Sequence, residues 1–279
     1  DIARFPHVPG HEFAGTVSAV GDGVDRAWLG RRVTAPFVFA CGDCPVCRAG
    51  AGQVCPRQRQ PGFTDPGSFA EFVVVRAAAT NLVALPDDLT TAQAAGLGCR
   101  VATAYRAVTA RADVRDGERV VVLGCGGGGR SARAAGGSRG GGGRRGAPCA
   151  GRPRGRQALG AAHGLLQGDD LPERVHELTG GGAEVSIEAL GSPATARAGI
   201  LCLGRRGRHV QVGLLPPAAG AAPIPMERVI AWELDVLGSH GMDARDYPAL
   251  LEDVSTGRIP LAGMLGERDP PTPGEAGTP

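Results

Sequence analysis

The chain contains no lysine, no long apolar run and no export signal. All 30 basic residues are arginine, and glycine accounts for 46 of the 279 residues. This bias is typical of a GC-rich genome, so charge statistics say little about function. No apolar stretch approaches the roughly 20 residues of a membrane helix, and the beginning DIARFPHVPG lacks the charged and apolar regions of a signal peptide. These absences predict a cytoplasmic protein with no membrane partner.

Net charge, cysteine spacing and length indicate the kind of partner, the redox compartment and the number of domains. A net charge of +2 is too small to imply a polyanionic partner for the whole chain. Four of the eight cysteines are scattered too widely for a disulfide scaffold, which suits a reducing compartment. A chain of 279 residues with ample apolar content favours two domains.

The other four cysteines form a compact knot, CGDCPVCRAGAGQVC. Cysteines on tight Gly and Pro turns at this spacing can converge on one tetrahedral zinc, with Zn–S bonds of about 2.3 Å. The alternative is a pair of disulfides, which is less favoured for so compact a cluster inside a long chain. We therefore expect a structural zinc held by Cys41, Cys44, Cys47 and Cys55.

The first hundred residues predict short strands and turns. Residues 7–24 alternate β-branched and small residues before a Gly-Asp-Gly turn, which is a strand and hairpin pattern, and residues 67–75 predict a further strand. His11 and Glu12 lie at the start of the first pattern, and both are potential zinc ligands. A Gly-His-Glu triplet alone is more typical of a solvent-facing histidine, and a lone cysteine such as Cys99 is usually a small core residue.

Five segments of the chain carry a recognisable pattern: the cysteine knot, GHEFAGTV at 10–17, GSFAEFVVV at 67–75, GLGCRVATAYRA at 96–107 and VVVLGCGGGG at 120–129. Together they resemble the zinc-dependent alcohol dehydrogenases of the medium-chain dehydrogenase/reductase family. The resemblance implies a catalytic zinc held by His11 and Cys99, with Glu12 approaching the metal during ligand exchange. The family's third ligand, an upstream cysteine, has no counterpart here, and we expect that an N-terminal piece is missing.

The same resemblance implies the architecture and the partners. We expect a β-rich GroES-like catalytic domain at 1–105, a Rossmann doubly wound parallel sheet at 106–237, and a partial return to the catalytic domain at 238–279. The implied substrate is a small alcohol or aldehyde, the implied cofactors are Zn2+ and NAD or NADP, and the implied assembly is a homo-oligomer, a dimer or tetramer.

A dinucleotide-binding turn is predicted after the strand at 119–123. Gly124, Gly126 and Gly129 satisfy the G-x-G-x-x-G spacing, for a tight turn, a close approach to pyrophosphate and helix–strand packing. By resemblance, Gly191 and Val212 would mark strand ends that face the cofactor, with His240 near the nicotinamide. The alternative for each is a strand terminus in the core.

The segment from Arg130 to Gly168 departs from this pattern. It has no acidic residue, no helical period of apolar residues, four consecutive glycines at 140–143 and no β-branched run for the central strand. A frame shift or mutation, a disordered linker and an Arg/Gly nucleic-acid tether all remain open. The absence of aromatic residues between Tyr105 and Trp232 disfavours nucleic acid. The position that would separate NAD from NADP is unreadable.

Helices and strands alternate again after Asp170, which predicts a doubly wound α/β sheet. The tail from Gly266 is rich in Pro and Gly and is expected to be disordered. The favoured function is a zinc-dependent oxidoreductase that transfers hydride between an alcohol and a nicotinamide. The rival is a catalytically inactive zinc-binding remnant or pseudoenzyme of that family.

Overall fold

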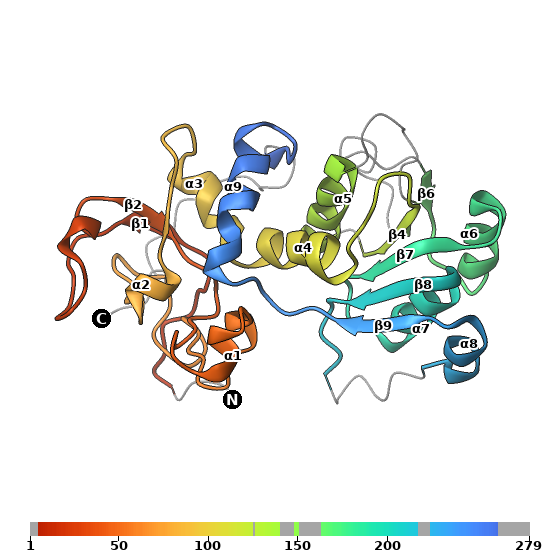
Figure 1. Ribbon diagram of the computed structural model, residues 1–279, viewed down its shortest axis with the longest axis horizontal. Helices are drawn as coiled ribbons and strands as arrows, with labels where there is room; N and C mark the ends of the chain where they lie inside the picture. Colours follow the sequence, from red (N-terminus) through yellow and green to blue (C-terminus); the bar gives the residue numbers. More distant parts are fainter. Residues whose placement is uncertain (1–4, 125, 140–147, 151–162, 217–223, 262–279) are drawn as a thin grey trace. The chain divides into compact units, whose positions relative to one another are not determined.

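The computed structural model describes residues 5–124, 126–139, 148–150, 163–216 and 224–261, which fall into two compact units (Figure 1). The first unit holds the described residues up to Ala102 together with His240–Thr256. The second holds Thr103–Ser239 and the described residues from Gly257 onward. None of the helices in these ranges is long and apolar enough to cross a membrane.

The first unit is built on a small antiparallel sheet in the order β1-β2-β3. Val33 of β2 is buried in the core of this unit. Thr34 beside it donates its hydroxyl to the Phe13 carbonyl at 2.8 Å, so β2 also holds the residue just before β1. Short helices and turns surround the sheet. Their bounds are β1 Ala14–Thr16, β2 Arg32–Thr34, α1 Pro45–Arg48, α2 Ala78–Asn81, β3 Val83–Ala84, α3 Thr91–Ala95 and α9 Tyr247–Ser255.

Two strand predictions for this unit need correction. Residues 67–75 form no sheet strand, and in the 7–24 pattern only Ala14–Thr16 is a strand. An extended segment joins a sheet only when a second backbone lies alongside it. No described residue pairs with 70–75 in this way, and these residues instead line, with β1, a groove of about 760 Å³. Phe72 and Val74 are exposed as a result.

The second unit contains a parallel sheet of six strands in the order β6-β5-β4-β7-β8-β9. Counted within this unit, the order is 3-2-1-4-5-6, which is the doubly wound dinucleotide-binding arrangement. The predicted fold class is therefore confirmed. The bounds are β4 Val120–Leu123, α5 Gly127–Arg139, β5 Pro148–Ala150, β6 His163–Leu165, α6 Leu171–Thr179, β7 Ala183–Glu188, α7 Pro193–Leu201, β8 Leu203–Gln211, α8 Met226–Trp232 and β9 Asp235–Gly238, with α4 Ala102–Arg106 at the start of the unit.

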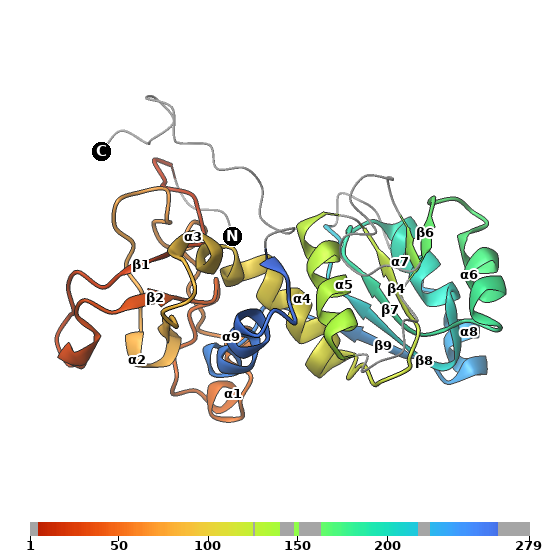
Figure 2. The same cartoon turned by 90° about the horizontal axis from the view of Figure 1, so that it is seen from above.

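Helices cover both faces of this sheet (Figure 2). Val121 and Leu123 belong to a buried cluster with residues of α6, whereas Val122 between them faces Gly129 of α5. Because successive side chains of a strand point to opposite faces, α5 and α6 must lie on opposite sides of β4.

The 130–168 segment, whose sequence pattern favours neither a helix nor a strand, contains regular structure in the part that is described. Residues Gly127–Arg139 form α5, and Pro148–Ala150 form β5, which pairs in parallel with both β4 and β6. The helix buries Ala132 and Ala135, whose small side chains allow close packing on the sheet. Tertiary packing has overridden weak local preference. The four glycines at 140–143, Cys125 and the tail from Gly266 lie outside the described residues.

Candidate zinc and dinucleotide sites

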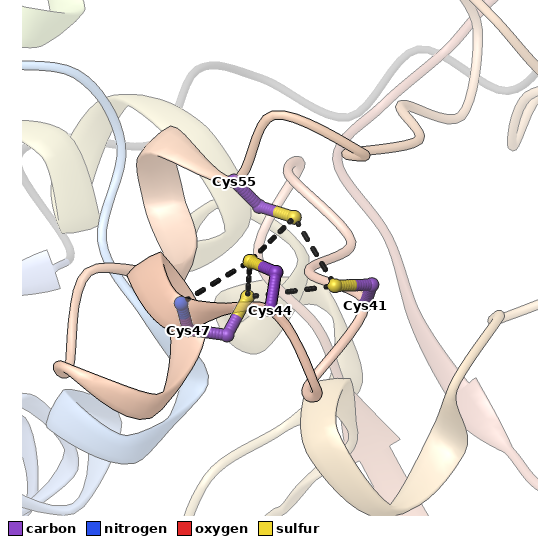
Figure 3. Close-up of side chains that lie close together, drawn as sticks. All are labelled: Cys41, Cys44, Cys47 and Cys55. Atoms are coloured by element: carbon purple, nitrogen blue, oxygen red, sulfur yellow. Dashed lines mark hydrogen bonds between the residues drawn. The ribbon is translucent and has the colours of Figure 1, made fainter.

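The four knot cysteines converge on one point (Figure 3). Cys44 is the N-cap of α1, Cys47 lies within that helix, and Cys41 and Cys55 flank it on turns. Their sulfur atoms lie 3.4 Å (Cys44–Cys47), 3.5 Å (Cys55–Cys41), 3.8 Å (Cys41–Cys47) and 3.9 Å (Cys44–Cys55) apart. Four sulfurs around a tetrahedral zinc would be about 3.8 Å apart.

These separations exclude the disulfide alternative. A disulfide bond would bring two sulfurs to about 2.0 Å, and all four cysteines are free. The sulfurs therefore fit a zinc ion of the structural, closed type, since all four positions are taken by protein ligands.

Nearby N–H groups favour the thiolate form that zinc requires. The Cys47 amide donates to Cys44 Sγ at 3.4 Å and lowers the pKa of the Cys44 thiol to about 6. The Arg57 amide donates to Cys55 Sγ at 3.3 Å, and its guanidinium Nη2 donates to Cys41 Sγ at 3.2 Å. Burial raises the pKa of the Cys47 thiol to about 12, so binding a metal there must displace a proton.

A distant segment holds the cysteine loop in place. Asp243 Oδ2 accepts the Gly52 amide at 2.9 Å, and Arg245 Nη2 donates both to Asp243 Oδ2 at 3.0 Å and to the Cys47 carbonyl at 2.7 Å. Burial alone would raise the pKa of Asp243, but the hydrogen bonds from Arg245 and Gly52 hold it below the ordinary value. Sequence analysis missed both residues, because no local pattern links position 243 to position 52.

The turn that carries Cys99 packs on the His11–Glu12 segment. The Arg100 amide donates to Glu12 Oε1 at 3.2 Å, and a Cβ added to Gly98 would lie 3.6 Å from the Glu12 Cα. Cys99 lies between these two contacts. The fold thus brings the Cys99 turn against the segment that carries Glu12, across 88 residues of sequence.

Their immediate surroundings are apolar. The His11 ring lies 5.2 Å from the ring of Phe63 and 5.9 Å from that of Phe37, measured between centroids. Burial raises the pKa of the Cys99 thiol to about 12, and the negative charge of Glu12 adds to the shift. Within the described ranges, the four knot cysteines alone bring three or more metal-binding atoms within 4.8 Å, so His11, Glu12 and Cys99 do not yet form such a cluster.

Tyr247 of α9 hydrogen-bonds to the backbone of the turn that carries Cys99. Its side chain is fully buried, and its hydroxyl donates to the carbonyls of Leu97 and Gly98, each at 3.3 Å. No local pattern in the sequence indicates this contact between position 247 and the turn.

The glycine turn after β4 fits a dinucleotide. Gly124 has a φ of +103°, which favours glycine, and a Cβ on Gly129 would lie 2.0 Å from the Gly124 carbonyl oxygen. A Cβ on Gly126 would meet nothing within 4 Å, so this position opens onto free space. Close packing at Gly124 and Gly129 and an open face at Gly126 match the three roles that a pyrophosphate-binding turn needs.

Two of the other predicted cofactor contacts lie at neighbouring strand ends, and the third lies elsewhere. Gly191 follows β7 and Val212 follows β8, and both donate their amides to Glu188, at 2.9 Å. His240 belongs to the first unit, where its ring packs edge-on against Phe37 at 5.3 Å.

Comparison with known families matches both units. The family described as the alcohol dehydrogenase GroES-like domain matches residues 1–87, and the family described as zinc-binding dehydrogenase matches residues 154–256.

Individual relatives match most of the chain. An alcohol dehydrogenase of Geobacillus stearothermophilus is 29% identical over 92% of this chain and 74% of its own length. A sorbitol dehydrogenase of Halalkalibacterium halodurans is 32% identical over 88% of this chain and 71% of its own. Among solved structures, the alcohol dehydrogenase TADH from Thermus sp. ATN1 superposes with a TM-score of 0.81 at 29% identity, covering 91% of this chain and 75% of that one.

Proposed function

Because the chain belongs to the zinc-dependent medium-chain alcohol dehydrogenase family, we propose that it oxidises an alcohol by transferring hydride to a nicotinamide dinucleotide, with His11 and Cys99 as ligands of a catalytic zinc. The observation that carries this proposal is the packing of the Cys99 turn on the His11–Glu12 segment, through Arg100 and Gly98. The knot cysteines hold a second zinc with a structural role.

When bound, the catalytic zinc supplies Lewis acidity toward the alcohol oxygen and the nicotinamide accepts the hydride. Cys99 Sγ and a His11 ring nitrogen would hold the metal. Glu12 is oriented by the Arg100 amide and stands ready as an additional carboxylate ligand. Phe37 and Phe63 limit the access of water to the His11 ring.

The second unit binds the dinucleotide. Gly126 lets the pyrophosphate approach the backbone at the start of α5, where free amides and the helix dipole favour a negative charge. In this proposal the strand ends at Gly191 and Val212 line the cofactor. NAD and NADP remain equal candidates, because residues 151–162 after β5 lie outside the described part.

The substrate we propose is a small alcohol or polyol and the matching carbonyl compound. Two relatives carry the names alcohol dehydrogenase and sorbitol dehydrogenase, which supports a hydroxyl-bearing substrate of this size. A panel of primary alcohols, secondary alcohols and sugar alcohols, assayed with NAD and with NADP, would identify both partners at once.

We further propose a homo-oligomer in the cytoplasm. The strand β9 is the last of its sheet, with Val236 exposed on it, and Met226 and Ile230 are exposed on the adjoining α8. The free thiols of the described cysteines suit a reducing compartment. Light scattering coupled to size exclusion should give a dimer or tetramer, and a monomer at micromolar concentration would contradict this.

Zinc analysis of the unmodified protein and three variants tests the catalytic site. The unmodified protein should contain two zinc ions per chain, whereas His11→Ala and Cys99→Ser should each keep one and lose alcohol oxidation. Cys47→Ser serves as the matched control, because it should remove the structural zinc instead. One zinc in the unmodified protein, with no NADH or NADPH binding, would favour the inactive remnant.

A further inference from the structure

A fully buried carboxylate lies where β7 ends, and no step described above uses it. Glu188 is 0% exposed and forms no ion pair with any described residue. Buried carboxylates without a counter-ion are costly unless hydrogen bonds replace water. Four donors do so here, and they come from different elements: the amides of Leu190 (2.9 Å) and Gly191 (2.9 Å), Thr195 Oγ1 (2.8 Å) and Gln211 Nε2.

A continuous chain of polar side chains extends from this carboxylate along the sheet. Gln211 Nε2 donates to Glu188 and to the Gly213 carbonyl, so its amide orientation is fixed and Oε1 is left to accept. His209 Nε2 lies 3.3 Å from that Oε1 and must therefore carry the proton. Its Nδ1 then accepts from the Ser186 hydroxyl at 2.8 Å. Each side chain of this hydrogen-bond network therefore has one consistent assignment of donors and acceptors.

These groups stand opposite one another because of the sheet register. Ser186 pairs with His209, and Glu188 pairs with Gln211, across the parallel strands β7 and β8. All four side chains lie on the α7 face, where a Cβ on Gly199 would lie 2.8 Å from the His209 ring. The network is thus covered by α7 and shielded from solvent. It ends at Glu188, the last residue of β7.

Three strand ends touch at that terminus. A Cβ on Gly124 would lie 3.1 Å from Leu190 N, and a Cβ on Gly213 would lie 2.2 Å from Gly191 N and 2.6 Å from Glu188 Oε2. The Glu188 carbonyl also accepts the amides of Val212 and Gly213, each at 2.9 Å. The spacing of the turns after β4, β7 and β8 therefore depends on how Glu188 is hydrogen-bonded.

We propose that Glu188 is a positioning residue for dinucleotide binding: its carboxylate fixes the turns at Leu190–Gly191 and Val212–Gly213 against the glycine turn after β4. The inference rests on the proposed function, because it assumes that these turns contact the cofactor. Glu188 itself is covered and touches no ligand. Its effect is exerted through the backbone that it holds.

The test compares Glu188→Gln with Glu184→Gln. In Glu188→Gln one carboxylate oxygen becomes an NH2 group, which faces either Gln211 Nε2 or the Gly191 amide. Two hydrogen-bond donors then oppose each other, and we expect the turns after β7 and β8 to move apart. Glu184 lies on the same strand, is partly exposed and pairs with Arg119 (Nε at 3.0 Å), so its change controls for loss of a carboxylate in β7.

NADH titration by fluorescence should show an affinity about 10- to 100-fold weaker for Glu188→Gln, since small misplacements at a binding site have effects of this size. Glu184→Gln should stay within about twofold of the unmodified protein. Zinc content and the KM for the alcohol should be unchanged in both, whereas the KM for the dinucleotide should rise only in Glu188→Gln. Equal NADH affinity in Glu188→Gln, or equal losses in the two variants, would overturn the proposal.

Hydrogen exchange separates this inference from the proposed function. Even without dinucleotide, the amides of Leu190, Gly191 and Gly213 should exchange faster in Glu188→Gln, and those of Val121 and Val122 should not. If the unmodified protein binds neither NADH nor NADPH, the proposed function fails, and unchanged exchange would independently overturn the positioning role. Should Glu188→Gln not fold, Thr195→Val removes one donor and should weaken NADH binding by a smaller factor, about three- to tenfold; no weakening would count against the proposal.

Discussion

The carboxylate of Asp243 accepts the backbone N–H of Gly52 at 2.9 Å, across 191 residues of sequence. Gly52 precedes the last of the four knot cysteines, and Arg245 beside Asp243 reaches the carbonyl of Cys47. A segment that follows the whole parallel sheet along the chain therefore stabilises the zinc-binding loop of the first unit.

Replacing Asp243 by Asn should destabilise this loop. The change removes a charged acceptor for Gly52 and Arg245, and loss of such hydrogen bonds costs about 1–3 kcal/mol. The effect should depend on pH. Because the folded-state pKa of Asp243 lies below its ordinary value of 3.8, its contribution is present above that value and is lost as the pH falls through the folded pKa. Urea unfolding at pH 7 and near pH 3 measures the loss of stability and its dependence on pH.

Asp87→Asn is the control for that experiment. Asp87 is fully exposed and lies 3.7 Å from Arg32, an arrangement that contributes little. The interpretation fails if Asp243→Asn is as stable as the unmodified protein at pH 7, or if its deficit is the same at both pH values.

Removal of the structural zinc should unfold the cysteine loop locally. In Cys44→Ser a zinc ligand whose thiol pKa is lowered by the Cys47 amide is lost, so zinc content should fall by one per chain and the melting temperature should drop by several degrees. Cys202→Ser is the matched change, since Cys202 is a buried thiol in the core of the second unit. It should lower stability but leave both zinc ions in place; zinc loss there would refute the assignment.

Replacing Arg57 should weaken zinc retention without removing a ligand. Its Nη2 donates to Cys41 Sγ at 3.2 Å, and Cys41 is the most exposed of the four. Groups that hydrogen-bond a metal ligand typically change metal affinity 10- to 100-fold. We expect faster zinc transfer to a chromogenic chelator in Arg57→Ala and partial recovery in Arg57→Lys. In Arg48→Ala, where the lost donor served the Asp43 carbonyl instead, transfer should be unchanged.

The two glycines of the dinucleotide turn should respond differently to alanine. A Cβ at Gly129 would lie 2.0 Å from the Gly124 carbonyl, so Gly129→Ala must displace the turn and lower the melting temperature. A Cβ at Gly126 meets nothing within 4 Å, so Gly126→Ala should fold normally but block the approach of pyrophosphate. Calorimetry with and without NADH checks both, and normal NADH binding by Gly126→Ala would contradict the site.

Tyr247→Phe should loosen the Cys99 turn. The change removes the hydroxyl that bridges the Leu97 and Gly98 carbonyls, and a hydrogen bond of this kind stabilises by about 0.5–1.5 kcal/mol. Zinc at His11 and Cys99 should be lost more readily to a chelator, whereas zinc at the knot should not. Equal behaviour of the two zinc ions would argue against a specific role for Tyr247.

The spacing of residues that are close in sequence was sufficient to predict some features of the structure. Cys41 to Cys55 span only 15 residues with Gly and Pro turns, so their convergence could be predicted without a fold. The glycine turn after β4 is equally local. In contrast, local preference failed between Arg130 and Gly168, because β5 pairs with β4, a strand from outside this segment, and α5 packs on the same sheet. It failed again at 67–75, where residues 67–69 bond to the backbone of residues 8–10 but residues 70–75 have no described backbone partner.

The amino-acid pattern alone therefore specified the ligand types, the zinc knot and the alternation of helices and strands, since each depends on neighbours within one or two turns of chain. The folded chain was needed to place Cys99 beside Glu12, to link Gly52 with Asp243 and to close the hydrogen-bond network around Glu188. Those relationships join residues that are far apart in sequence or paired by strand register. Sheet order and the path of the returning chain decide them, and neither leaves a local mark in the sequence.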